Sequence, residues 1–304
     1  MSSYISRKCP CCNSVKTHRH SVKTPLDASE LELDQLQNYW NGFFKEKAIF
    51  SYVRCISCGL LYCPIFFTNK QLEMLYEQMP ANMDEVPLNS LSKTQYGYFK
   101  YLKKYSRLYG NFLEIGPDIG LFTKNCVLEG NFSKFWLFEP NHSVENALKK
   151  VVKNKNFKII NEMFNFRDVP DNSIDVAIMI HVMDHLLDPL ATLKQIRKKL
   201  KKDSHLLIVT HDESSFLRKL FNWRWPAFCL QHPQLFNKKS TRKILNVANF
   251  NVVVQGKTTN YFKISFLLRH LLWALGFKVN KVPNFFGLTI GLKLGNIITI
   301  ATTK

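Results

Sequence analysis

The feature that most constrains the fold is a glycine turn between an apolar segment and a helix-forming one. The run Phe112–Ile115 is apolar apart from one acid and suits a buried strand, and the turn after it contains Gly116 and Gly120. A strand, a glycine turn and a helix in this order are typical of a nucleotide-binding crossover. The acid, Glu114, directly precedes the strand's last residue and distinguishes this turn from other glycine turns.

From this turn onward, apolar strands alternate with helices. Such alternation predicts a parallel sheet covered by helices, that is, a Rossmann-like doubly wound α/β fold. The tail adds a helix over Arg242–Ala248 and strands over Phe250–Val254 and Ile297–Thr302. The predicted strands of the main part are Phe112–Ile115, Phe135–Glu139, Phe157–Ile160, Ile174–Ile180 and His205–Thr210, and the predicted helices are Leu121–Glu129, Ser143–Val152 and Pro189–Leu200.

The acids around the turn indicate which nucleotide it binds. In a doubly wound sheet the ligand lies at the carboxyl ends of the strands, and Glu139 ends the second predicted strand, where an acid can accept the ribose hydroxyls. A pyrophosphate-binding turn reads G-x-G-x-x-G, whereas Asp118 stands between the glycines here. Because Glu114 and Asp118 would repel a pyrophosphate, the turn favours a cationic nucleoside such as S-adenosylmethionine.

Cysteine pairs predict a structural zinc site in the N-terminal part. Two Cys-x-x-Cys pairs supply four thiolates, which suit tetrahedral Zn²⁺ and leave no open position for catalysis. His18 or His20 is an alternative to one of these ligands, and unrelated free thiols are the alternative to a metal site. The chain begins without a secretory signal, so its eight cysteines favour metal or free thiols over disulfides. The predicted ligands are Cys9, Cys12, Cys55 and Cys58, and the cysteines that fit no pair are Cys11, Cys63, Cys126 and Cys229.

The charge is strongly basic, with 42 Lys and Arg against 23 Asp and Glu, a net charge of +19. One interpretation is a lysine-rich solvated surface, and the other is a surface that attracts phosphate in RNA, anionic lipid or a nucleotide-linked substrate. The first is favoured because the charges are scattered and few aromatics lie between them. No apolar run is long enough to span a bilayer, so a cytoplasmic protein is expected.

The chain resembles the class I S-adenosylmethionine-dependent methyltransferases. The resemblance is carried by residues 113–120, 138–140, 173–189, 232–236 and 248–250. The cysteine pairs, together with residues 58–62, are similar to the zinc-binding segment of some small-molecule methyltransferases of this superfamily. Two positions depart mildly from the pattern: Asp118 stands where the family often has Gly, and Asp184 where it usually has Glu.

The resemblance also implies roles for individual residues. Glu139 would hold the ribose, and the residues after the third strand would border the adenine, although ordinary core packing is an equal alternative for these. The residues implied for the methionine part are Glu114, Gly116, Asp118 and Gly120, and those implied for the adenine are Met163 and Phe164.

A hydroxyl acceptor needs a general base besides alignment with the methyl group. The candidates are His181 after the fourth strand, His211 after the fifth, and His232 in the following loop. Their alternatives are a hydrogen bond near the cofactor carboxylate for the first and solvated loops for the other two. His185 is expected to be a structural residue that begins a helix and bonds to backbone.

These observations divide the chain into a zinc-binding module over residues 1–78, a linker and leading helix over 79–110, and a class I methyltransferase domain with C-terminal cap elements over 111–304. The expected function is methylation, mainly O-methylation, of a small molecule such as a sugar or a nucleotide-linked sugar, with a phosphate-bearing sugar fitting the basic charge. The alternatives are an RNA methyltransferase and a non-catalytic zinc-binding interaction protein. The aromatic segment Phe262–Trp273 is expected to belong to a helical cap, and a peripheral membrane or dimer contact is its alternative.

Overall fold

The computed structural model describes residues 4–40, 48–77, 86–162, 165–277, 279, 282 and 287–304. Met163 and Phe164 lie outside the described residues, as does most of the predicted linker, residues 79–85.

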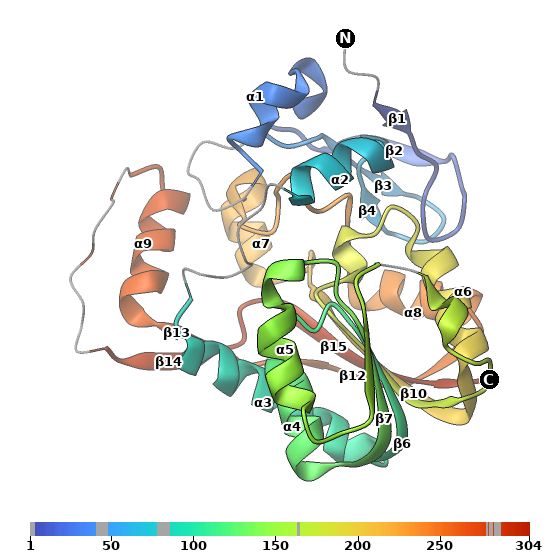
Figure 1. Ribbon diagram of the computed structural model, residues 1–304. Coiled ribbons are helices and arrows are strands. Elements are labelled where there is room, and N and C mark those ends of the chain that lie inside the picture. Colours follow the sequence, from blue (N-terminus) through green and yellow to red (C-terminus); the bar gives the residue numbers. More distant parts are fainter. Residues whose placement is uncertain are drawn as a thin grey trace.

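A seven-stranded mixed sheet forms the centre of the molecule, in the order β12-β15-β10-β9-β6-β7-β8 (Figure 1). The strands β10, β9, β6, β7 and β8 are parallel, and β15 is antiparallel to both β10 and β12. The predicted Rossmann-like α/β fold is therefore confirmed, with an antiparallel pair added at one edge. The bounds are β6 Tyr109–Ile115, β7 Asn131–Phe138, β8 Phe157–Ile160, β9 Ile174–Ile180, β10 Leu200–His211, β12 Phe250–Lys257 and β15 Asn296–Thr303.

Helices cover both faces of this sheet because its strands are apolar on both sides. Phe112 of β6 packs in one core cluster with α3 (Leu88–Tyr105), α4 (Leu121–Glu129) and α5 (Glu145–Val152). The next residue, Leu113, packs on the opposite face with α6 (Pro189–Lys199) and α8 (Lys238–Val247). This alternation follows from the two-residue period of a strand.

The predicted bounds of β8 and β9 are identical to those in the structure, whereas β10 begins earlier than the predicted start at His205. The strand begins at Leu200, directly after α6, and Leu200 pairs with Ile174 before the register shifts at His205. The residues between, 201–204, are polar and carried no strand pattern. A strand that continues from a helix without a turn therefore has no boundary signal in the sequence.

The N-terminal part forms a four-stranded sheet, and one edge strand of this sheet, β11, comes from the C-terminal half of the chain. Its order is β11-β4-β3-β2, and β11 pairs with β4 through Gln234 with Tyr62 and Leu235 with Leu61. Arg7 also links the N-terminal part to the C-terminal half of the chain, because its guanidinium donates to Leu187 O at 2.8 Å and to Pro233 O at 3.0 Å. The bounds are β2 Thr17–Val22, β3 Tyr52–Cys55, β4 Leu61–Tyr62 and β11 Gln234–Leu235.

Short elements complete the fold. Thr68 caps α2 (Asn69–Glu77), since its Oγ1 accepts from Gln71 N at 3.2 Å while its own N donates to Gln71 Oε1 at 2.8 Å, as the sequence predicted. The remaining strands and helices are β1 Ile5–Ser6, β5 Ile65–Phe66, α1 Leu33–Gln37, α7 Phe216–Phe221, β13 Asn260–Lys263, α9 Ile264–Ala274 and β14 Thr289–Leu292.

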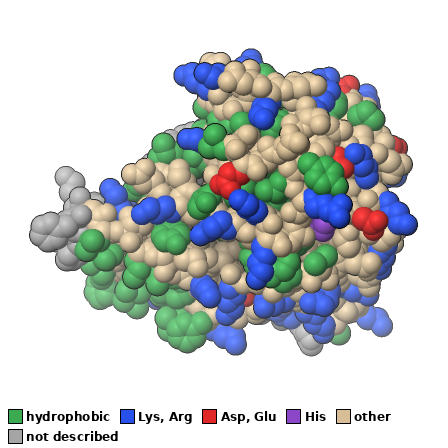
Figure 2. Space-filling view, turned by 90° about the horizontal axis from the view of Figure 1, so that it is seen from below, with side chains coloured by type: hydrophobic (Ala, Val, Ile, Leu, Met, Phe, Trp, Pro, Cys, Tyr) green, Lys and Arg blue, Asp and Glu red, His purple; other side chains and the backbone are tan. Residues whose placement is uncertain are grey.

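The segment around α9 presents apolar side chains to solvent. Leu271 is 42% exposed, Leu275 56% and Phe277 59%, and apolar side chains gather at one end of the face seen in Figure 2. Within the described residues, no helix combines the length and the apolar character needed to cross a membrane.

Candidate active site

The carboxyl ends of β6, β7, β9 and β10 meet at one edge of the sheet because these strands are parallel. This edge carries Glu114 and Gly116 from β6 and its turn, Glu139 after β7, His181 after β9, and His211 at the end of β10. The sheet order reverses between β6 and β9, and this is the point where doubly wound sheets bind ligands.

Both glycines of the turn after β6 are required by their backbone conformation and by the space around them. Gly116 has φ +67°, and a Cβ there would lie 2.9 Å from Val182 Cγ2. Gly120 has φ +78°, and a Cβ there would meet Leu148 Cδ1 of α5 at 2.9 Å. Both conformations favour glycine. The space beside Gly120 is filled by α5, so packing explains this residue without a ligand.

Glu139 is fixed by the backbone around it. Its Oε2 accepts from Asp118 N at 2.8 Å and its Oε1 from Asn141 N at 2.9 Å. The residue is 6% exposed, and this burial raises the pKa of its carboxyl. Each carboxylate oxygen retains a further lone pair. The structure thus presents an oriented acceptor group directly after β7.

Glu114 is a buried acid with one hydrogen bond, from Thr123 Oγ1 to its Oε2 at 2.6 Å. It is 2% exposed, and burial, with a smaller contribution from the charge of Glu139, raises its pKa to about 8. A cationic ligand would favour the ionised form. The two acids beside the Gly116 turn therefore fit the sulfonium, ammonium and ribose groups of S-adenosylmethionine.

The three histidines predicted as base candidates come together at the same edge. The ring centroids of His181 and His211 are 4.8 Å apart, and those of His211 and His232 are 4.9 Å apart. His185 joins them, with its ring centroid 4.5 Å from that of His232. These four residues, with Asp184, are called the histidine cluster below. Burial, with a further effect of His211, lowers the pKa of His181 to about 3, so that its ring is neutral at pH 7.

A buried carboxylate orients His211. Asp184 Oδ2 accepts from His211 N and from His211 Nδ1, both at 2.9 Å. The Asp184 side chain is 0% exposed and that of His211 24%. Because Nδ1 carries the proton, Nε2 carries the lone pair, and it has no hydrogen-bond partner in the part of the chain that the structure describes. The sequence indicated Asp184 only as a departure from the family pattern.

The expectation for His185 was wrong, because its ring bonds to side chains and not to backbone. Tyr76 OH lies 3.2 Å from His185 Nδ1, and His185 Nε2 lies 3.2 Å from His232 Nε2. His232 Nδ1 lies 2.7 Å from Ala227 O, which can only accept, so this nitrogen carries a proton. Tyr76, His185 and His232 thus form one hydrogen-bonded chain that ends on Ala227 O.

The four paired cysteines converge as the sequence predicts. The Sγ atoms of Cys9 and Cys58 are 3.4 Å apart and those of Cys12 and Cys55 are 3.6 Å apart, and all four lie within 4.8 Å of one another. Gly59, at φ +78°, makes the second pair's turn, in which its N donates to Cys55 O at 2.8 Å. These spacings fit a tetrahedral Zn²⁺ site.

Among the cysteines that fit no pair, Cys11 lies next to this site, with its thiol interacting with that of Cys58. All eight cysteines are free thiols. Cys11, Cys63 and Cys126 are buried, and Cys229 Sγ lies 3.3 Å from His232 Nδ1. His18 and His20 lie on β2, but their side chains are outside what the structure describes.

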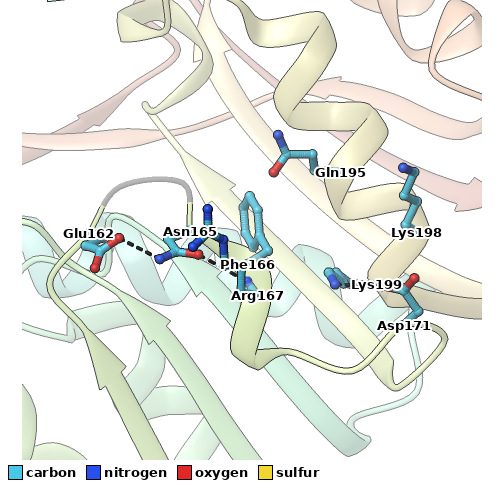
Figure 3. A pocket seen from close by; sticks show the side chains of 8 residues that line it. All are labelled: Glu162, Asn165, Phe166, Arg167, Asp171, Gln195, Lys198 and Lys199. Atoms are coloured by element: carbon cyan, nitrogen blue, oxygen red, sulfur yellow. Dashed lines mark hydrogen bonds and ion pairs between the residues drawn. The ribbon is translucent and has the colours of Figure 1, made fainter.

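A separate hollow of about 960 Å³ lies between α6 and the connection from β8 to β9 (Figure 3). Its lining side chains are charged or polar apart from Phe166, and Lys199 and Asp171 among them form an ion pair at 2.6 Å. None of its lining residues belongs to the cysteine site or the histidine cluster.

Residues 91–255, more than half of the chain, match the model of a protein family described as "Methyltransferase domain". No curated protein matches the sequence.

Solved methyltransferase structures are similar to the chain at low identity. An S-adenosylmethionine-dependent methyltransferase from Aquifex aeolicus is 14% identical, with 72% of this chain and 95% of that chain covered, at a TM-score of 0.49. The 1,6-didemethyltoxoflavin N1-methyltransferase of Burkholderia thailandensis, solved with its substrate and S-adenosylhomocysteine, is 12% identical, with 70% and 79% covered, at 0.48. A Leishmania major S-adenosylmethionine-dependent methyltransferase is 11% identical, with 88% and 82% covered, at 0.48.

Proposed function

The chain belongs to the methyltransferase domain family and is an S-adenosylmethionine-dependent methyltransferase, and from this we propose that it methylates a hydroxyl of a small molecule, with sugars and nucleotide-linked sugars as the substrate class. The observation that carries this proposal is the histidine cluster at the carboxyl ends of β9 and β10, beside the cofactor turn. A hydroxyl must lose its proton during methyl transfer, and this cluster is where it can do so.

The cofactor supplies a methyl group that its sulfonium has already activated. In our proposal the chain binds and orients it: Glu139 takes the ribose hydroxyls, and the turn at Gly116, with Glu114 and Asp118, surrounds the methionine part. The fixed Glu139 carboxylate and the buried Glu114 support this assignment. Orientation of the reacting atoms within about 3–3.5 Å is the main task left to the protein.

We further propose that the four paired cysteines hold a structural Zn²⁺ and that the N-terminal module covers the acceptor side of the site. Tyr52 OH donates to His232 O at 2.5 Å, and Tyr76 OH bonds to His185. Arg54 forms an ion pair with Glu213 at 2.8 Å, two residues after β10. The module therefore contacts the segments that follow β9 and β10, which favours an enclosed site for a small acceptor.

The charge on the one face seen in Figure 2 gives no support to an RNA acceptor. Lys and Arg side chains are scattered over the face seen in Figure 2 and do not form one stripe on it. An RNA site would need a continuous basic path with aromatic side chains for stacking.

Calorimetric titration of the full-length protein with S-adenosylmethionine tests the cofactor site. We expect wild type to bind it and Glu139→Ala to weaken binding at least about 10-fold through loss of the charged hydrogen-bond acceptor. Glu129→Ala is the matched control, because Glu129 is a surface residue paired with Lys103. Equal affinity in wild type and Glu139→Ala would rule out the ribose assignment.

A panel of hydroxyl acceptors then tests the substrate class. Formation of S-adenosylhomocysteine is measured with simple sugars, sugar phosphates, nucleotide-linked sugars and RNA oligonucleotides. Turnover that depends on a sugar or nucleotide-linked sugar is expected. Turnover with RNA alone would contradict the proposal.

A further inference from the structure

The histidine cluster has two halves that differ in how their polar atoms are satisfied. In one half, His185 and His232 form a chain of hydrogen bonds that runs from Tyr76 to Ala227 O. In the other half, His181 and Asp184 keep buried atoms that have no partner among the residues that the structure describes. The second half of the cluster is therefore the candidate for a ligand-binding site.

The unsatisfied atoms lie in the interior. His181 Nδ1 and Asp184 Oδ1 are both buried and have no hydrogen-bond partner among the described residues. Asp184 is held only through Oδ2, by the two nitrogens of His211, so Oδ1 presents a free lone pair at a side chain that is 0% exposed. Buried polar atoms without partners are rare in native proteins and call for an explanation such as a bound ion.

His181 is also held in a costly conformation. Its φ is +52°, in the left-handed region that residues with a Cβ avoid. Its other ring nitrogen, Nε2, accepts a hydrogen bond from Asn296 Nδ2 at 3.3 Å, so the proton of the neutral ring lies on Nδ1. A metal ion at Nδ1 would move this proton to Nε2, which the Asn296 amide can still hold through its oxygen after rotation.

We propose that His181, Asp184 and His211 form a binding site for one divalent transition-metal ion. Each offers one ligand atom, and these three atoms lie within 4.8 Å of one another. For His211 the ligand atom beside Asp184 is Nδ1, and an ion bound there would move the ring proton from Nδ1 to Nε2. Two imidazoles and a carboxylate suit Mn²⁺, Fe²⁺, Co²⁺ or Zn²⁺, whereas Mg²⁺ prefers oxygen ligands. With three protein ligands the ion keeps open positions, unlike the four-cysteine site.

The position of this site gives the ion a role in methyl transfer. It lies after β9 and β10, at the edge that carries Glu114 and Glu139. An ion there would hold the oxygen of the acceptor and make its hydroxyl more acidic. This role rests on the proposed function, while the site itself rests on the three side chains alone.

Titration of the full-length protein with Co²⁺, followed by calorimetry and visible absorption, tests the proposal. We expect one Co²⁺ per chain with the spectrum of nitrogen and oxygen ligands and without the thiolate charge-transfer band that a cysteine site gives. His181→Ala and His211→Ala should each lower the affinity for Co²⁺ at least about 100-fold. His142→Ala is the control for surface binding, because that side chain is 76% exposed, and it should leave the affinity unchanged.

Thermal unfolding of each variant shows whether it is folded, and Asp184→Asn provides a variant of the same size that also removes a ligand charge. No Co²⁺ binding by wild type overturns the proposal, and so does the same affinity in the folded His181→Ala, His211→Ala and Asp184→Asn variants, which would mean an adventitious ion only. Titration of the same wild-type sample with S-adenosylmethionine separates the two proposals. Cofactor binding without Co²⁺ binding overturns the ion site alone, and Co²⁺ binding without cofactor binding overturns the proposed function alone.

Discussion

The cysteine site and the histidine cluster both gather metal-ligating side chains, but they are built in different ways. The cysteine site comes from two local turns, each of which brings a pair of thiols together by its own spacing. The histidine cluster combines residues that follow β9 and end β10, which are parallel neighbours, with His232, which lies two residues before β11. Local spacing builds a closed site that is suited to stability, and topology builds an open site that is suited to a substrate.

The two regions are also joined, since the N-terminal module supplies Tyr52 and Tyr76 to the segments that carry His232 and His185. A structural site at one end of the molecule should therefore affect chemistry at the other. The predictions below test how far each region depends on the other, from the largest expected effect to the smallest.

Loss of the proposed zinc site should have the largest effect. Cys55→Ser combined with Cys58→Ser should release the metal and unfold the N-terminal module, because a structural zinc site supplies on the order of 10 kcal/mol of folding free energy in small domains. Methyl transfer should fall below detection, since in our proposal the module covers the acceptor side. Metal analysis and an activity assay measure this, with Cys126→Ala as the control, since Cys126 is buried in a different core cluster. Zinc retained by the double variant would show that the four thiolates are not its ligands.

His211→Ala should lower the rate of methyl transfer about 10²–10⁴-fold, the range for loss of a group that handles the acceptor proton. S-adenosylmethionine binding should stay the same, because His211 lies on the acceptor side of the edge. The measurements are kcat and the calorimetric affinity. His205→Gln, in the same strand but six positions from its end, is the control. Full activity in His211→Ala would show that His211 takes no part in the reaction.

Glu114→Gln should stabilise the cofactor-free protein at alkaline pH. The folded pKa of about 8 lies above the ordinary value of 4.5, so the folded protein binds the proton more tightly than the unfolded chain. Wild type therefore loses stability as pH rises from about 4.5 to about 8, by roughly 2–4 kcal/mol, and the glutamine variant does not. Denaturant unfolding at pH 5 and pH 8.5 measures the difference. An equal loss of stability in both proteins would show that a group other than Glu114 causes the pH dependence.

Tyr76→Phe should have the smallest effect, about 1 kcal/mol, because it removes one hydrogen bond to His185 and leaves the ring in place. A fall in kcat of up to about 10-fold with unchanged cofactor affinity is expected. Tyr39→Phe, elsewhere in the same module, serves as the comparison. An effect on zinc content instead of kcat would assign Tyr76 to the fold of the module.

The sequence predicted the sheet and the convergence of His181, His211 and His232, because strand order alone places strand ends at one edge. It could not predict the hydrogen bond between Tyr76 and His185, which are 109 positions apart. It also could not predict that Asp184 orients His211, since an acid before a histidine has no local signature of its partner. Local spacing is readable in a sequence, whereas contacts made by the tertiary fold are not.

The most direct test of the central claim is a single-turnover assay with S-adenosylmethionine and a panel of hydroxyl acceptors, in wild type and His211→Ala. The account predicts that wild type forms S-adenosylhomocysteine only when a sugar or nucleotide-linked sugar acceptor is present, and that the variant forms it at least about 100-fold more slowly. Acceptor-dependent turnover at the same rate in both proteins would contradict the account.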